Sequence, residues 1–319
     1  MTVYLTETAL VLTPMHVRFV DLCVASGFSC AYALERLGIR GHCFDPDAPS
    51  VQCRALTRLF RKMRLFQPTT VPSIRRAMQR PLLQYVGRPH PRPADVSEVE
   101  IAGVPCRRLV GPDPMCVIHG GGFIGGNWPG YAGYCAALSA LTGRGVVFVE
   151  YDTDQAHATQ VAQVAAVLNA MPFDVAVADS AGAHLLLCAH DDYAAAAEHT
   201  VLFSPVADPT CSSASFLANG NCYLADARDE NGDPIGEALL HPTVTSTLLR
   251  SITTRVPQSV PPNTRVYASE NELFADDARY LERLGATALI SPPHPGGHFH
   301  AWPLWDIPEA NATLRAAFL

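Results

Sequence analysis

The sequence FDVAVADSAGAHLLLCAH occupies residues 173–190 and changes character at its centre. The valines of its first half are typical of a short buried strand, and its second half has the apolar content of a helix that begins at Ala181. Ser180 stands at the junction, between Ala178 and Gly182. A serine between small residues in a sharp strand-to-helix turn is the arrangement called a nucleophile elbow, because the turn leaves the hydroxyl exposed.

The rest of the chain repeats this alternation of short apolar strands and helices. We predict strands at residues 96–104, 105–110, 115–119, 145–151, 200–203, 264–268 and 287–290, and helices at residues 131–141, 156–170, 243–252, 276–284 and 308–318. The alternation predicts an α/β fold with a mostly parallel central sheet and helices on both faces. Turn-forming residues interrupt it at 206–262, which predicts a lid-like insertion.

A proline-rich linker at residues 87–94 divides the chain. We therefore expect an N-terminal appendage and cap at residues 1–94 and the main domain at residues 95–319. The net charge is −7, yet ten Arg and Lys residues and no acidic residue lie between Ala48 and Ala94. Apolar residues recur there at roughly helical spacing, namely Leu56, Leu59, Phe60 and Met63. This pattern predicts a helix whose apolar stripe covers a pocket, and a surface that docks on anionic lipid or nucleic acid is the alternative.

A run of glycines follows the strand predicted at residues 115–119. It reads His119-Gly120-Gly121-Gly122-Phe123 and precedes Ser180 by about sixty residues. Consecutive glycines let backbone N–H groups converge on one point, as an oxyanion hole requires. A phosphate-binding loop is not expected, because no GK[ST] follows the glycines.

Together, HGGGF at residues 119–123 and ADSAGA at residues 178–183 resemble the hormone-sensitive-lipase-like (bacterial family IV) carboxylesterases of the α/β-hydrolase superfamily. The resemblance extends over residues 96–319. It implies the α/β-hydrolase fold and hydrolysis of a small-molecule ester with a small or medium acyl chain, without a cofactor. Two positions depart from the family pattern: Ala178 replaces a glycine of the elbow, and EYDTDQAH at residues 150–157 replaces DYRLAPEH. A family member that binds or rearranges a small molecule without hydrolysis is therefore the alternative.

The resemblance also implies a Ser–acid–His triad with Ser180 as nucleophile, since a serine needs a histidine base and that histidine needs a carboxylate. Aligning the family's acid motif from Ser269 puts the acid on Glu272, with Glu270 as the alternative. HAWP at residues 300–303 matches the end of the family's base loop, so His300 is the expected base and His298 the alternative.

Other residues near these motifs are given structural roles. The expected oxyanion donors are the N–H groups of Gly121, Gly122 and Ala181, while His119 and Gly120 shape the loop. We expect Asp276 and Asp277 to cap the helix at residues 276–284. His184 and His190 are expected to be packing histidines with satisfied hydrogen bonds.

No metal or cofactor is expected. The ten cysteines lie singly, without a CxxC pair, and read as reduced, mostly buried thiols of a cytoplasmic protein. His294, His298 and His300 lack a second ligand group at metal spacing. Ala25, Gly27, Cys30 and Asp45 match a dinucleotide fingerprint poorly, because two of its three glycines are missing.

Partners other than the ester are not predicted. No apolar run reaches the ~18–20 residues of a membrane span, so stable membrane insertion is not expected. Nucleic acid is not an expected partner either, and the sequence leaves a homodimer open.

Overall fold

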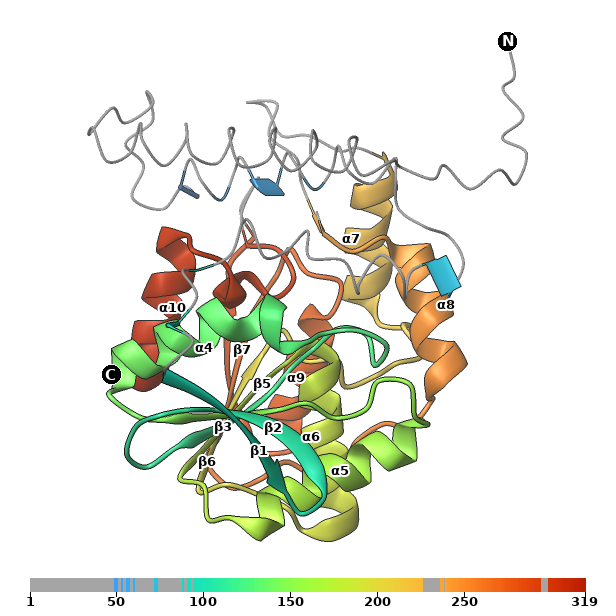
Figure 1. Cartoon of the computed structure of the whole chain (residues 1–319). Helices are drawn as coiled ribbons and strands as arrows, with labels where there is room; N and C mark the ends of the chain where they lie inside the picture. The colour runs from blue at the N-terminus through green and yellow to red at the C-terminus, as the bar shows by residue number, and fades with distance from the viewer. Residues whose placement is uncertain are drawn as a thin grey trace.

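The computed structural model describes residues 95–225, 239–293 and 298–319, together with isolated positions before and between them (49, 50, 53, 56, 57, 60, 72, 73, 88, 91, 92, 236 and 237). The fingerprint weighed at Ala25–Asp45, most of the basic stretch, and His294 lie outside these residues. Figure 1 shows the described elements around one central sheet.

The sheet has eight strands in the order β1-β2-β4-β3-β5-β6-β7-β8. Their bounds are β1 Val96–Ile101, β2 Val104–Leu109, β3 Met115–Ile118, β4 Val146–Val149, β5 Val175–Asp179, β6 His199–Phe203, β7 Thr264–Ser269 and β8 Thr287–Ser291. Strand β2 runs antiparallel to β1 and β4, and the other neighbouring pairs are parallel. The mostly parallel sheet predicted from the alternating pattern is confirmed.

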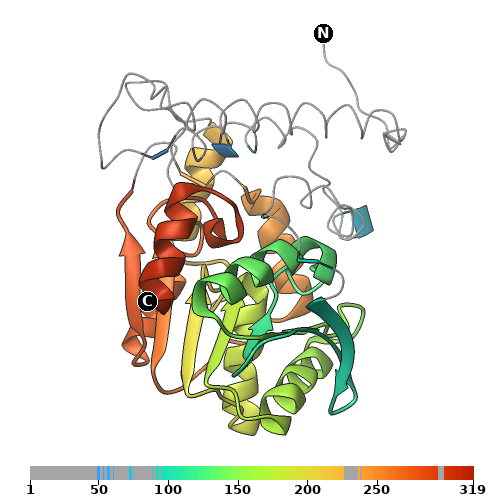
Figure 2. The same ribbon diagram turned by 60° about the vertical axis from the view of Figure 1, so that its left-hand side comes forward.

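Helices cover both faces of this sheet, as predicted (Figure 2). Helices α4 (Trp128–Thr142) and α10 (Pro308–Phe318) pack on one face, and α5 (His157–Ala170), α6 (Ser180–Tyr193) and α9 (Ala275–Arg283) pack on the other. Strand residues alternate between these layers because successive side chains of a strand point to opposite faces. In β3, for example, Val117 packs with α4, whereas Ile118 packs with α5 and α6.

The insertion between β6 and β7 contains two helices, α7 (Ala214–Ala225) and α8 (Pro242–Ile252). The sequence predicted α8 but not α7, whose small and polar residues carry a weak helical pattern. Gly220 lets the two helices approach closely, because a Cβ there would lie 2.9 Å from the Cβ of Pro242. Helix α8 packs over the glycine run, with Leu248 against Ile124.

Part of the N-terminal segment packs against the C-terminal part of the chain. Cys53, Leu56 and Phe60 are buried in the same core cluster as Phe299 and Trp305. The Phe60 ring lies edge-on to both aromatic rings, with centroids 5.0 Å and 5.1 Å away. The positions of the helical stripe that the structure describes are thus buried, whereas Leu59 and Met63 lie outside the described residues.

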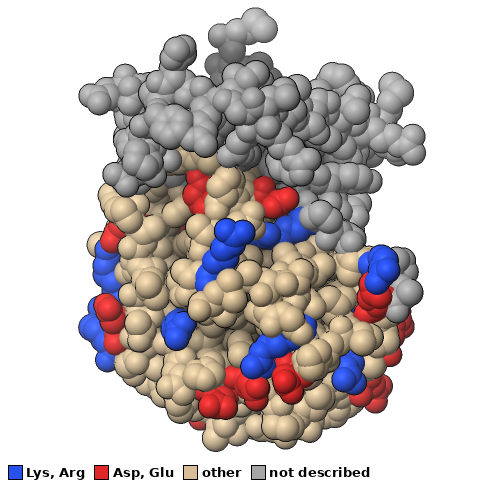
Figure 3. All heavy atoms as spheres, turned by 90° about the vertical axis from the view of Figure 1, so that its left-hand side faces the viewer, with Lys and Arg blue, Asp and Glu red and all other residues tan. Residues whose placement is uncertain are grey.

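The described surface carries mixed charge on the face in Figure 3, where basic and acidic side chains lie beside one another. None of the helices among the described residues is both long and apolar enough to cross a lipid bilayer. The free cysteines Cys53, Cys106, Cys116, Cys135, Cys188 and Cys211 are all buried, as predicted for reduced thiols.

Candidate active site

Ser180 stands at the end of β5 and opens α6 with a φ of 50°. A positive φ is uncommon for a residue with a side chain and marks the sharp turn. Gly182 is required here, since a Cβ at that position would lie 2.3 Å from the carbonyl oxygen of His119. Ala178, where the resembled family has glycine, pairs in regular register with Leu202 and Ile118. The alanine therefore fits within the strand before the turn.

Two further side chains meet Ser180 in one hydrogen-bonded series. The Oγ of Ser180 lies 2.8 Å from Nε2 of His300, and Nδ1 of His300 lies 3.0 Å from Oε2 of Glu272. A carboxylate only accepts hydrogen bonds, so Nδ1 of His300 donates to it and Nε2 is left to accept from the serine. The other Glu272 oxygen accepts the Ser269 N–H at 2.9 Å. The structure thus brings together Ser180, Glu272 and His300.

Both alternative residues lie elsewhere. Nδ1 of His298 is 2.7 Å from the Ser291 hydroxyl, and the His298 ring stacks on Trp302 at 4.7 Å. Glu270 forms an ion pair with Arg279. The loop that carries His300 is held by Ser204, whose hydroxyl accepts the Ala301 N–H at 2.9 Å.

Buried carboxylates set the charge state of His300. Burial disfavours its protonated form, but the hydrogen bond and charge of Glu272, with the charges of Glu237 and Asp179, raise its pKa above the ordinary value. Burial raises the pKa of Glu272, and His300 opposes that shift. Glu237 is fully buried and accepts the Leu239 N–H at 2.8 Å. Glu237 could not be predicted as a neighbour of this site, because it lies in the turn-rich insertion outside any motif.

The glycine run presents backbone donors beside the elbow. Gly121 and Gly122 have φ values of 118° and 60°, in the region that favours glycine. Their N–H groups have no hydrogen-bond partner among the described residues. Ala181 lies in the first turn of α6, where backbone N–H groups lack partners within the helix. The Gly120 N–H, in contrast, donates to Tyr131 at 3.0 Å and to Asp179 at 3.1 Å.

His119 is buried beneath the glycine run and contacts both that run and Tyr151. Its ring stacks against Tyr151 with a centroid distance of 4.2 Å, and its Nδ1 lies 2.7 Å from the Gly120 carbonyl oxygen. Burial lowers the pKa of His119 to about 4, so its ring is neutral near pH 7. Burial raises the pKa of Asp179 to about 6, against the hydrogen bonds that Tyr131 and Gly120 donate to it. These contacts fit a loop-shaping role for His119.

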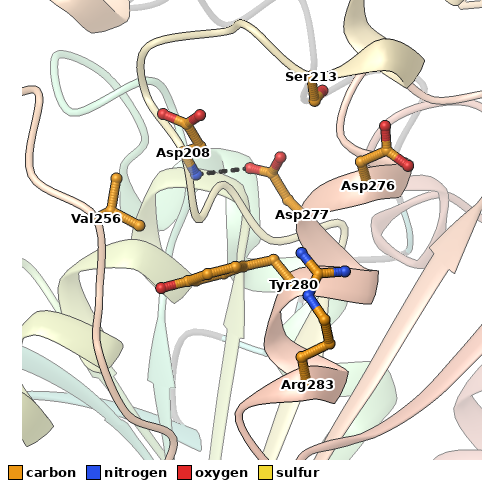
Figure 4. A pocket seen from close by; sticks show the side chains of 7 residues that line it. All are labelled: Asp208, Ser213, Val256, Asp276, Asp277, Tyr280 and Arg283. Atoms are coloured by element: carbon orange, nitrogen blue, oxygen red, sulfur yellow. Dashed lines mark hydrogen bonds between the residues drawn. The ribbon is translucent and has the colours of Figure 1, made fainter.

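The capping roles expected for Asp276 and Asp277 are wrong. Helix α9 has no side-chain cap; the Asp277 carboxylate binds backbone N–H groups of the loop after β6, and the Asp276 carboxylate binds one in the first turn of α7. Oδ2 of Asp277 accepts from Ala207 at 2.6 Å and from Asp208 at 2.9 Å, and Asp276 accepts from Ser215 at 2.8 Å. Figure 4 shows Asp277 turned toward Asp208, in a pocket that contains none of the predicted site residues. These long-range partners cannot be read from local sequence.

The expectation for His184 is correct for burial and wrong for hydrogen bonding. His184 is fully buried, yet its Nε2 has no hydrogen-bond partner in the described part of the chain. The unpartnered nitrogen lies near His157 and Cys188, a grouping that the sequence analysis did not consider. A His-x-x-x-Cys spacing on the helix at residues 181–190 was the signal that could have found it.

A scan against models of known protein families finds no match, and a search among curated proteins finds none either. Solved structures do match. An esterase/lipase from an uncultured bacterium is 18% identical with a TM-score of 0.62, over 85% of this chain and 96% of the other. A hormone-sensitive lipase from a metagenome library is 16% identical with a TM-score of 0.65, over 83% and 96%. An esterase from the bacterial hormone-sensitive lipase family is 18% identical with a TM-score of 0.63, over 86% and 96%. The chain therefore has the α/β-hydrolase fold.

Proposed function

We propose that this chain is a serine hydrolase that cleaves carboxylic esters with small or medium acyl chains. The observation that carries the proposal is the hydrogen-bonded series from Ser180 through His300 to Glu272. Its position at a strand-to-helix turn adds support, as do the nearby N–H groups of Gly121 and Gly122, which have no acceptor among the described residues. The esterases and lipases that share this fold are consistent with it.

In the first half of the reaction, the Ser180 oxygen attacks the ester carbonyl carbon while Nε2 of His300 takes the hydroxyl proton. Glu272 holds the tautomer of His300 and stabilises the imidazolium that forms. The carbonyl oxygen becomes an oxyanion, which accepts hydrogen bonds from the N–H groups of Gly121, Gly122 and Ala181. Each such donor is worth ~2.7–4 kcal/mol in comparable sites.

Collapse of this intermediate breaks the bond to the alcohol, and His300 returns the proton to the departing oxygen. The acyl group stays on Ser180. In the second half, His300 removes a proton from water, which attacks the acyl carbon, and the carboxylic acid leaves as Ser180 regains its proton. No cofactor takes part in either half.

The test is the hydrolysis of p-nitrophenyl acetate and butyrate by the full-length protein and by Ser180→Ala. We expect Ser180→Ala to remain folded and to lose turnover and labelling by a fluorophosphonate. Ser212→Ala, at an exposed serine of the insertion, is the matched control and should keep both. A panel of p-nitrophenyl esters of increasing chain length then gives the acyl preference.

Near-normal turnover in Ser180→Ala would remove Ser180 as the nucleophile. Failure of the folded parent protein to take the label would favour the alternative function, a protein that binds or rearranges a small molecule without hydrolysis.

A further inference from the structure

Three side chains with metal-binding atoms meet between helices α5 and α6. His157 is the first residue of α5, while His184 and Cys188 lie one turn apart on α6 and so share a face of that helix. One ligand atom from each of the three lies within 4.8 Å of those of the other two. None of the three belongs to the proposed hydrolytic site.

One ring nitrogen of each histidine in this cluster has no hydrogen-bond partner among the described residues. Nδ1 of His184 lies 3.2 Å from the Val206 carbonyl oxygen, which can only accept, so Nδ1 carries the proton and Nε2 carries a lone pair. That Nε2 and the Nε2 of His157 are both buried without a hydrogen-bond partner among the described residues. Buried polar atoms are rarely left unpaired, because the unmade bond costs free energy. A histidine whose other nitrogen donates to a backbone carbonyl is also the arrangement of a metal-ligating histidine.

We propose that His157, His184 and Cys188 bind one transition-metal ion of the Zn²⁺ class, with water at the fourth position. Two imidazole nitrogens and one thiolate suit Zn²⁺ or Co²⁺, whereas Mg²⁺ and Ca²⁺ prefer oxygen ligands. Bond lengths of ~2.0–2.3 Å in a tetrahedral site put the ligand atoms ~3.3–3.6 Å apart, so the three side chains must close by at most about 1.5 Å. His157 is only half-buried, whereas His184 and Cys188 are fully buried.

Charged side chains lie near the cluster. The thiolate form of a cysteine is the metal ligand, so binding must displace the Cys188 proton to solvent. Asp192 pairs with Arg255 at 2.8 Å, and both act on Cys188 together with Asp191. Arg255 favours the Cys188 thiolate, whereas Asp191 and Asp192 disfavour it.

The location of the cluster assigns the metal a structural role. The Phe123 ring, which ends the glycine run, meets the rings of His157 and His184 edge-on at 5.4 Å each. Gln160, on the same helix as His157, donates to the Phe123 carbonyl oxygen at 3.0 Å. A bound ion would therefore hold α5 and α6 together behind the glycine loop.

The test uses the full-length, tag-free protein, stripped with a chelator and then dialysed against Co²⁺ or Zn²⁺. We expect about one ion per chain by mass spectrometry, a thiolate-to-cobalt charge-transfer band in the near ultraviolet, and a higher Tm with metal. Cys188→Ala and His157→Ala should lose the stoichiometric metal, the band and the rise in Tm. The matched controls are Cys211→Ala, at a buried cysteine elsewhere, and His190→Ala, on the same helix; both should keep all three.

Two results would overturn the proposal. One is that the parent protein retains no metal; the other is that Cys188→Ala and His157→Ala retain as much metal as the parent and keep its thiolate-to-cobalt band. Circular dichroism checks that each variant is folded. If Cys188→Ala does not fold, His157→Ala decides the outcome. His157 is the half-buried first residue of α5, so we expect its substitution to disturb the fold less than that of the buried Cys188.

Discussion

His298 and His300 are two residues apart and have different surroundings. His300 bonds Ser180 and Glu272, whereas His298 bonds Ser291 and stacks on Trp302. We expect His300→Ala to lower kcat by about 10⁴–10⁶, as loss of a triad member does in serine hydrolases, and His298→Ala to lower it far less. Steady-state kinetics on p-nitrophenyl butyrate measure both. The reverse ranking would move the base to His298.

The acid limb of the pH profile should report on His300. A protonated Nε2 cannot accept the Ser180 proton, so kcat/KM falls as the pH drops through the pKa of the free enzyme. Because nearby carboxylates raise that pKa above its ordinary value of 6.5, the midpoint should lie above pH 6.5.

The carboxylate behind this shift can be tested separately. Glu272→Gln removes the nearest negative charge and should move the midpoint to lower pH, while lowering kcat because glutamine does not fix the tautomer. Glu270→Gln is the matched control and should leave the midpoint in place. An identical midpoint in Glu272→Gln and the parent enzyme would contradict the assignment of Glu272.

Single residues were predictable from sequence only where a motif fixed their register. HAWP and the elbow pointed to His300 and Ser180, which the fold brings within hydrogen-bonding distance. Contacts between segments far apart in the sequence could not be predicted in this way, because no local pattern encodes them. Examples are the position of Glu237 near His300, the position of His157 near His184, and the hydrogen-bond partners of Asp277.

Helix α9 is tied to the loop after β6 by Asp277, which suggests a stability test. Asp277→Ala leaves the Ala207 and Asp208 N–H groups without their acceptor and should cost about 1–3 kcal/mol of unfolding free energy for each. Asp277→Asn keeps an acceptor oxygen and should cost less. Urea unfolding measures the unfolding free energy of both variants. Equal values for Asp277→Ala and Asp277→Asn would contradict a stabilising role for these two hydrogen bonds.

The same carboxyl should make stability depend on pH. Burial raises the pKa of Asp277 from 3.8 to about 7, so between about pH 4 and 7 folding takes up a proton and this group's contribution to stability falls as the pH rises. Asp277→Asn should lack this contribution, and its stability relative to the parent should improve from pH 5 to pH 7.5. Asp152→Asn, at an exposed position, is the control, and the difference between its stability and that of the parent protein should stay the same from pH 5 to pH 7.5.

Among the elements, those with strong periodicity were predictable. Every predicted strand is present within three residues of its expected bounds. The parallel strands β3 and β4 are continuous apolar runs because they are buried on both faces. Helix α7 escaped prediction because glycine and asparagine weaken its pattern, and its packing against α8 compensates only in the folded chain.

Across the whole molecule, the N-terminal segment meets the loop that carries His300, since Phe60 packs on Phe299. We expect Phe60→Ala to lower stability by ~3–5 kcal/mol, as for other buried phenylalanines. If the segment also caps the acyl site, the ratio of kcat/KM for p-nitrophenyl octanoate and acetate should change. Thermal unfolding measures the loss of stability, and hydrolysis assays on the two esters measure the ratio.

A destabilised control separates these effects. Leu168→Ala removes a buried side chain from α5 in the opposite core layer and should lower Tm without changing the ratio. If the ratio is unchanged in a folded Phe60→Ala variant, Phe60 contributes to stability but the segment does not cap the acyl site. The sequence predicted its apolar stripe from helical spacing, but the aromatic partners near the C-terminus were beyond the reach of any local pattern.

The contact between Phe60 and Phe299 has a consequence for how the protein is made. A ribosome releases Phe60 more than 200 residues before Phe299, which at ~5–20 residues per second is a delay of at least about 10 s. During that time Phe60 lacks the Phe299 and Trp305 rings that lie edge-on to it in the folded protein. His300 emerges directly after Phe299, so the hydrogen-bonded series from Ser180 through His300 to Glu272 can form only after residue 300 has left the ribosome.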